Sequence, residues 1–384
     1  MERRNFLRTV VIGTSAAAFG GSLWHGAAHA APAQPGAGPY GALQAPDTNG
    51  IRLPSGFSSR VIARSGQAVS GTSYLWHNAP DGGACFGDGS GWIYVSNSEI
   101  NPGGGASAVT FDSSGNITAA YRILSDTRQN CAGGGTPWNT WLSCEEVSRG
   151  YVYETDPWGG ASTRRDTMGL FKHEAAAADP VRRAVYLTED ETNGCFYRFV
   201  PSTWGDLSSG TLQVLQAGTG TSGSFTWATV PDPDGSPAFT RDQVSGAKRF
   251  NGGEGCYYAD DTVWFTTKGD NRVWQVNLAT GTYELAYDDS LVSGTPPLTG
   301  VDNVTGSGSG DLFVAEDGGD MEICIITPDD VVAPFLRIDG QAGSEITGPA
   351  FSPDGTRLYF SSQRGTLGTP LGGITYEVKG PFRS

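Results

Sequence analysis

The sequence has few cysteines and, beyond its first thirty residues, no long hydrophobic run. The six cysteines lie far apart and never form a C-x-x-C pair, which disfavours a zinc ribbon. No later segment approaches the ~20 apolar residues that a membrane-spanning helix requires. No long stretch shows an apolar period of 3.6 residues either, so a helical fold is also disfavoured.

Basic residues are scarce relative to acids. The chain has 25 Lys and Arg against 40 Asp and Glu, with a net charge of −15, and this excludes the electrostatic footprint of a nucleic-acid-binding protein. An acidic surface can serve solubility alone, but acids in glycine-rich loops are also typical of calcium sites. Glycine, with 56 residues, is about twice its usual share and predicts many tight turns.

The N-terminus has the features of an export signal. Arg3-Arg4 precedes a mildly apolar segment, 9–24, and a small-x-small cleavage motif ends at Ala30. We predict a Tat signal over residues 1–30, read by the Tat machinery, and a secreted or periplasmic mature protein. The alternative is a membrane anchor, which the short, glycine-rich apolar core disfavours. Residues 31–45, rich in Ala, Pro and Gly, are expected to be a flexible lead-in.

The remaining chain is repetitive. Six times, a short apolar run is followed by a polar turn and a second apolar run, as expected for two central strands of an antiparallel sheet. Most units start about 45 to 50 residues apart, the period of a propeller blade. We therefore predict an all-β, six-bladed β-propeller, a single domain over residues 46–384, with 208–244 as an insertion; a pair of β-sandwiches is the alternative. The paired runs are 92–95 with 107–111, 140–143 with 150–154, 184–187 with 194–199, 262–265 with 271–276, 311–314 with 321–326, and 357–360 with 372–378.

Acidic residues follow the first apolar run in four of the six units. Equivalent loops of successive blades point toward the central funnel, where the carboxylates would repel one another unless cations neutralised them. The recurrence predicts a centre of several metal ions on the axis, although an ordinary polar turn would explain any single loop. The acids are Glu99, Glu145, Glu146, Glu189, Asp190, Glu191, Glu316 and Asp317.

One motif combines a thiol, glycines and carboxylates. Asn130-Cys131-Ala132-Gly133-Gly134 is followed by Ser143-Cys144-Glu145-Glu146. A thiolate binds transition metals, carboxylates suit hard cations, and glycines allow a tight loop around them. A turn with a buried cysteine is the alternative interpretation of this motif alone.

A set of motifs in the same order resembles the PhoX-type alkaline phosphatases, from about Gly56 to Gly365. Besides the motif at Cys131, the matching segments are 76–83, 96–99, 169–174, 302–303, 316–318 and 348–355. The resemblance implies a phosphatase that hydrolyses a small phosphate ester at a Ca²⁺ and Fe³⁺ centre in the propeller funnel, and we expect a monomer. It implies Cys131, Glu174 and Glu254 as the catalytic centre, with Cys131 on iron. The further metal-site residues that it implies are Glu99, Glu145, Glu146, Asp302, Glu316 and Asp317.

The sequence departs from the family at Gly252, two residues before Glu254, where the best-known branch carries an arginine. An arginine there would hold phosphate oxygens in a bidentate contact. Arg249, Lys268 and Arg364 are the side chains that could replace it. Two other functions stay open: a calcium-dependent propeller lactonase, and a non-catalytic secreted propeller with structural calcium.

Overall fold

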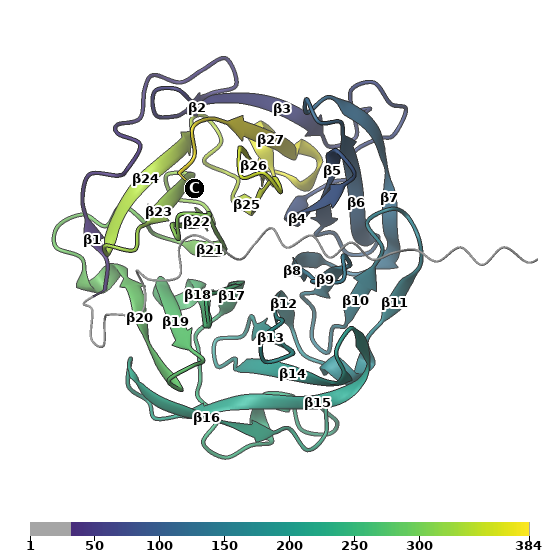
Figure 1. The fold of residues 1–384 in the computed structure, drawn as a ribbon, viewed down its shortest axis with the longest axis vertical. Coiled ribbons are helices and arrows are strands. Elements are labelled where there is room, and N and C mark those ends of the chain that lie inside the picture. The colour runs from purple at the N-terminus through teal and green to yellow at the C-terminus, as the bar shows by residue number, and fades with distance from the viewer. Residues whose placement is uncertain (1–31, 384) are drawn as a thin grey trace, which may run out of the picture.

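The computed structural model describes residues 32–383, which form β-sheets arranged in a ring around a central axis (Figure 1). Three of the sheets have four strands. They are β4 (Pro80–Asp88), β5 (Gly91–Ser98), β6 (Gly104–Phe111) and β7 (Ile117–Thr127); β8 (Asn130–Gly135), β9 (Trp141–Glu145), β10 (Val152–Thr155) and β11 (Ser162–Arg164); and β25 (Ile346–Phe351), β26 (Arg357–Ser362), β27 (Ile374–Lys379) and β3 (Ser58–Arg64).

The other two sheets are larger. The nine-stranded sheet contains, in spatial order, β12 (His173–Asp179), β13 (Ala184–Glu189), β14 (Phe196–Thr203), β15 (Asp206–Ala217), β16 (Gly223–Thr229), β20 (Thr282–Asp288), β19 (Arg272–Asn277), β18 (Thr262–Thr267) and β17 (Gly253–Ala259). The six-stranded sheet contains β1 (Gln34–Pro35), β24 (Val331–Ile338), β23 (Glu322–Ile326), β22 (Leu312–Glu316) and β21 (Val301–Gly306), with β2 (Ile51–Arg52) also on β24. Short 3-10 helices lie at Asp166–Met168, Thr240–Asp242, Lys268–Asp270, Asp289–Leu291, Gly365–Leu367 and Pro370–Gly372.

The predicted all-β, propeller-like fold is confirmed, but the described strands do not separate into six sheets. The reason lies in the segment predicted as an insertion, 208–244. Much of it forms β15 and β16, and β16 pairs with β15 on one side and with β20 on the other. This pairing joins two four-stranded groups, so five sheets are formed.

Six strands surround the axis: β4, β8, β12, β17, β21 and β25 (Figure 1). Together they line a cavity of about 310 Å³. Small residues are required along these strands, because a Cβ atom on Gly133 would lie 1.9 Å from the carbonyl oxygen of Leu142 in the adjacent strand β9. One on Gly134 would lie 1.9 Å from that of Ala176 in the next sheet. Glycine therefore permits the close approach of neighbouring strands at the centre.

Aromatic side chains fill the spaces between neighbouring groups of strands around the ring. Phe196 of β14 stacks on Phe265 of β18 with 4.4 Å between ring centroids, and Tyr94 of β5 stacks on Tyr359 of β26 at 4.9 Å. All four rings are buried. The hydrophobic core thus lies between neighbouring groups of strands, and this packing fixes their positions around the axis.

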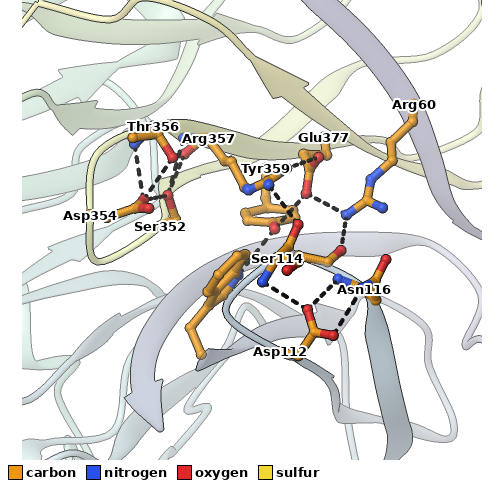
Figure 2. A network of polar contacts seen from close by, with 12 residues as sticks. Arg60, Asp112, Ser114, Asn116, Ser352, Asp354, Thr356, Arg357, Tyr359 and Glu377 are labelled. Atoms are coloured by element: carbon orange, nitrogen blue, oxygen red, sulfur yellow. Dashed lines mark hydrogen bonds and ion pairs between the residues drawn. The ribbon is translucent and has the colours of Figure 1, made fainter. Parts of the chain in front are cut away.

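A polar network joins the first and last parts of the ring (Figure 2). Strand β3, from the N-terminal part of the chain, pairs with β27, and Glu377 of β27 contacts Arg60 and Arg357 at 2.7 Å each. The two arginines also donate hydrogen bonds to the carbonyl groups of Gly115 and Ser114, in the turn between β6 and β7. One buried carboxylate therefore ties the closing sheet to its neighbour.

Part of the segment expected to be a flexible lead-in contacts the ring. Gln34 and Pro35 pair in parallel with β24, and Ala33 is buried, with its N–H bonded to the carbonyl of Ala286.

The predicted Tat signal, 1–30, lies outside the described residues. Within 32–383, no helix is long and apolar enough to cross a membrane, and all six cysteines are free thiols.

Candidate metal centre

An irregularity in pairing recurs at the start of the first strand of each group. In β8 the pairing with β9 is interrupted between Asn130 and Gly133, and in β12 the pairing with β13 is interrupted between His173 and Ala176. Such β-bulges bend a strand and re-aim a side chain. In five strands the first residue of the interruption carries a potential metal ligand: Asp81 in β4, Cys131 in β8, Glu174 in β12, Glu254 in β17 and Asp302 in β21.

A second set of polar residues lies at the same end of the axis. Because the first and second strands are antiparallel, the residue after each second strand is close to the bulge of its partner. These six residues are Glu99, Glu146, Asp190, Lys268, Asp317 and Gln363, after β5, β9, β13, β18, β22 and β26 respectively. We call the bulge residues and these six residues, together with Glu345, the acid ring.

Ligand atoms of the acid ring form overlapping groups in which all atoms lie within 4.8 Å of one another. Cys131 belongs to two of these groups, one on each side of it, and Asp302 also belongs to two. The groups therefore form a continuous arc rather than isolated pairs. They are Asp81, Glu99 and Cys131; Cys131, Glu146 and Glu174; Glu174, Glu254 and Asp302; and Asp302, Asp317 and Glu345.

Two predicted site residues, Glu145 and Glu316, stabilise loops and are not part of this arc. Glu145 accepts hydrogen bonds from the N–H groups of Arg128 and Tyr151, at 2.9 and 3.1 Å. Glu316 accepts from the N–H of Glu322, and its own small group, with Glu322 and Cys324, lies apart from the ring. Glu189 makes the same kind of contact, because its carboxylate accepts a hydrogen bond from the N–H of Cys195. Each glutamate ends a second strand and binds an N–H six residues later.

The donor set fits bound cations. Both carboxylate oxygens of Glu174 are buried and have no hydrogen-bond partner, and its exposed fraction is 0%. Burying a charged group without a partner is strongly unfavourable, and a cation would supply the missing contacts. Oxygen ligands suit Ca²⁺, whereas a thiolate such as that of Cys131 suits a transition metal.

The pKa values of the ring residues also favour bound cations. Burial, followed by repulsion from neighbouring carboxylates, raises the pKa of Asp81 and of Glu174 well above the usual range. Burial and the charge of Glu99 raise the pKa of Glu146 to about 9, and burial raises that of Asp302 to about 7. Burial also raises the pKa of the Cys131 thiol. Cations would therefore bind with release of protons from the ring.

Two lysines contact the ring. Lys172 Nζ lies 2.8 Å from Glu146 Oε1 and 2.6 Å from Asp190 Oδ2. Lys268 Nζ lies 3.0 Å from Glu254 Oε1 and 3.5 Å from Asp317 Oδ2. The contact with Glu254 lacks hydrogen-bond alignment, so it is an electrostatic contact only.

The sequence patterns did not indicate Asp81, Glu345 or Gln363 as residues of the site. Gln363 donates hydrogen bonds to Asp81 at 2.7 Å and to Glu99 at 2.5 Å. Asp81 lies in segment 76–83, which resembles the family, and this resemblance could have identified Asp81 as a site residue. Glu345 precedes β25 and pairs with Arg364 at 2.8 Å, and no sequence pattern indicated this contact.

The side chains that could replace the arginine absent at Gly252 lie at different distances from the acid ring. Gly252 has φ +73°, and a Cβ atom on it would lie 3.1 Å from Asp190 Oδ1. An arginine at 252 would thus adopt a strained backbone conformation. Arg249 binds the carbonyl of Asn193 and the carboxylate of Asp242, away from the ring. Lys268 and Arg364 face it.

The sequence matches the model of a family described as "Alkaline phosphatase PhoX" over residues 96–284. That segment contains five members of the arc, namely Glu99, Cys131, Glu146, Glu174 and Glu254. The resemblance to PhoX-type alkaline phosphatases indicated by the sequence motifs is thereby confirmed. No curated protein matches the chain significantly.

Solved structures agree with this assignment in fold. Pseudomonas fluorescens PhoX in complex with vanadate, a transition state analogue, is similar with a TM-score of 0.72 and 18% identity, over 88% of this chain and 97% of that chain. A gluconolactonase from Xanthomonas campestris has a TM-score of 0.50 and 11% identity, over 89% and 99%. Regucalcin, a calcium-binding protein from Agrobacterium tumefaciens, has a TM-score of 0.50 and 16% identity, over 85% and 96%.

Proposed function

We propose that this PhoX-family protein is a metal-dependent phosphatase that hydrolyses small phosphate esters at the acid ring. The observation that carries the proposal is the arc around Cys131 and Glu174, within the segment that matches the family. The fold shared with Pseudomonas fluorescens PhoX supports it. Glu174 contributes two buried oxygens without partners at the middle of the arc.

The ring would hold Fe³⁺ and Ca²⁺ on different sides. Cys131, the only thiol of the arc, would hold ferric iron together with Glu174. Glu254, Asp302 and the remaining ring carboxylates offer oxygens only, which suits calcium. When bound, such cations neutralise the charge of the ester phosphate and lower the pKa of an attacking oxygen.

Arg364 is the side chain best placed to hold the phosphate. It contacts Glu345 Oε1 at 2.8 Å, and about a third of its side chain is exposed at the edge of the ring. A guanidinium has five N–H donors, so donors remain for a second anion after the contact with Glu345. Glu345, in turn, fixes the orientation of the arginine. This arrangement would replace the arginine absent at Gly252.

The wider assignments complete the proposal. We infer that the nine-stranded sheet counts as two blades joined by β16, which gives six blades with equivalent bulges and loop residues. We also propose export through the Tat pathway, from residues 1–30, and a monomer. The segment 46–384 would then be one domain, with its acid ring in the funnel.

A lactonase is the second candidate, because the fold resembles that of a gluconolactonase at a TM-score of 0.50. The position of Cys131 within the arc favours the phosphatase, since oxygen ligands alone would serve calcium. A substrate panel separates the two: the protein loaded with Ca²⁺ and Fe³⁺ should hydrolyse phosphate monoesters and leave aldonolactones intact. Lactone hydrolysis without phosphatase activity would overturn the proposal.

A further inference from the structure

Lys268 occupies a ring position that carries an acid in four other groups of strands. It directly follows the second strand β18, as Glu99, Glu146, Asp190 and Asp317 follow β5, β9, β13 and β22. Lys268 therefore has the same position as these four acids and the opposite charge.

The ammonium of Lys268 lies between two carboxylates. Its distances of 3.0 Å to Glu254 and 3.5 Å to Asp317 join the first strand of one group, β17, to the loop after β22 of the next. The side chain is about two-thirds buried. A single positive charge thus fills the space in which Glu254 and Asp317 would otherwise repel each other.

The ring carboxylates divide into two classes. Glu146 and Asp190 share Lys172, and Glu254 and Asp317 share Lys268. Glu345 is paired with Arg364. Among the described side chains, Glu174 and Asp302 have no ion pair, and Asp81 and Glu99 both accept hydrogen bonds from the neutral amide of Gln363. Of these four carboxylates without an ion pair, Asp81, Glu99 and Glu174 share a group with Cys131.

We propose that Lys268 is a built-in counter-cation that takes the place of one metal ion between Glu254 and Asp317. The inference rests on the proposed function, because it assumes that cations fill the rest of the ring. The space between Glu254 and Asp317 then holds the ammonium instead of a metal ion, and it stays neutralised when metal is removed from the rest of the ring. A divalent ion can enter that space only after the ammonium is gone.

The test is Lys268→Met, which keeps the length of the side chain and removes the charge. Bound calcium is counted by equilibrium dialysis and elemental analysis at saturation. The variant should bind one more calcium ion per chain than the wild type, and without metal it should melt at a lower temperature. Lys268→Arg keeps the charge and should retain the wild-type count. Lys379→Met, an exposed lysine at the end of β27, is the matched control.

The outcomes separate this inference from the proposed function. An unchanged calcium count in a folded Lys268→Met protein overturns the inference, as does an unchanged count with a raised KM, which would make Lys268 a contact for the substrate anion. A wild type that binds calcium but hydrolyses no phosphate ester, while Lys268→Met binds one ion more, supports the inference and contradicts the proposed function. If neither protein binds calcium, both are wrong.

Discussion

Glu145 and Glu146 are consecutive residues whose carboxylates serve different parts of the structure. Glu145 holds its own loop through the N–H groups of Arg128 and Tyr151, whereas Glu146 lies 2.8 Å from Lys172 in the acid ring. The same division separates Glu316 from Asp317. In each pair, the residue that ends the second strand stabilises the loop, and the next residue faces the axis.

Exchanging each carboxylate for an amide should therefore have different effects. We expect Glu145→Gln to lower the free energy of unfolding by roughly 1–3 kcal/mol, because it weakens buried hydrogen bonds, and to leave the calcium count unchanged. Glu146→Gln should reduce the stabilisation by calcium with little change in the metal-free protein. Urea unfolding with and without calcium measures both. Equal effects of the two variants on calcium binding would show that the division is wrong.

Cys131 should be required for binding a transition metal. We expect purified protein to contain iron and to absorb visible light through thiolate-to-iron charge transfer, and Cys131→Ser should lose both. Cys85→Ser is the control, because Cys85 lines the axial cavity and belongs to no group of the acid ring. Elemental analysis and an absorption spectrum decide the matter. Retention of iron and colour in Cys131→Ser would contradict the assignment.

The metal-free protein should lose stability as the pH rises. Burial raises the pKa of Glu146 from 4.5 to about 9 and that of Asp302 from 3.8 to about 7. At a pH between the usual pKa and the raised pKa of each group, the folded state binds more protons than the unfolded state. The free energy of unfolding therefore falls as the pH increases through this interval. Calcium binds the deprotonated ring, so its stabilising effect should grow over the same interval. Melting temperatures at pH 5, 7 and 9, with and without calcium, test this; a metal-free value that rises to pH 9 would contradict it.

The network that closes the ring should contribute to stability independently of metal (Figure 2). Glu377→Gln removes the partner of Arg60 and of the buried Arg357, and it weakens the hydrogen bond from Tyr359. We expect a loss of about 3–5 kcal/mol, because a buried guanidinium is left unpaired. The calcium-dependent increment in melting temperature should stay the same. Arg52→Gln, at the exposed pair with Asp339, is the control and should change stability little.

The sequence allowed the all-β, propeller-like fold to be predicted, because the paired apolar runs and their spacing follow directly from strand periodicity. It also placed seven ring residues in the site, among them Cys131 and Glu174. The joining of two strand groups through β16 was not predictable, since a Gly-, Ser- and Thr-rich segment reads equally well as a loop. Its pairing depends on a neighbour, β20, that is remote in sequence.

Which side chains of the acid ring face the axis depends on β-bulges, and the pattern of apolar residues does not indicate these bulges. The interruption between Asn130 and Gly133 re-aims Cys131, and its counterpart in β4 re-aims Asp81. Whether the first or second acid of a loop faces the axis depends on where the strand ends, which composition does not reveal. Contacts such as Gln363 with Asp81 join residues 282 positions apart and arise only from the closure of the ring.

The central claim is that the acid ring is a metal-dependent phosphatase centre, and the most direct test is the hydrolysis rate of an aryl phosphate monoester at alkaline pH. Wild-type protein stripped of metal is titrated with Ca²⁺ in the presence of Fe³⁺, with Glu174→Gln treated identically. We predict no hydrolysis before metal is added, recovery in the wild type as calcium rises, and little recovery in Glu174→Gln. Full activity in the metal-free protein, or equal recovery in Glu174→Gln, would contradict the claim.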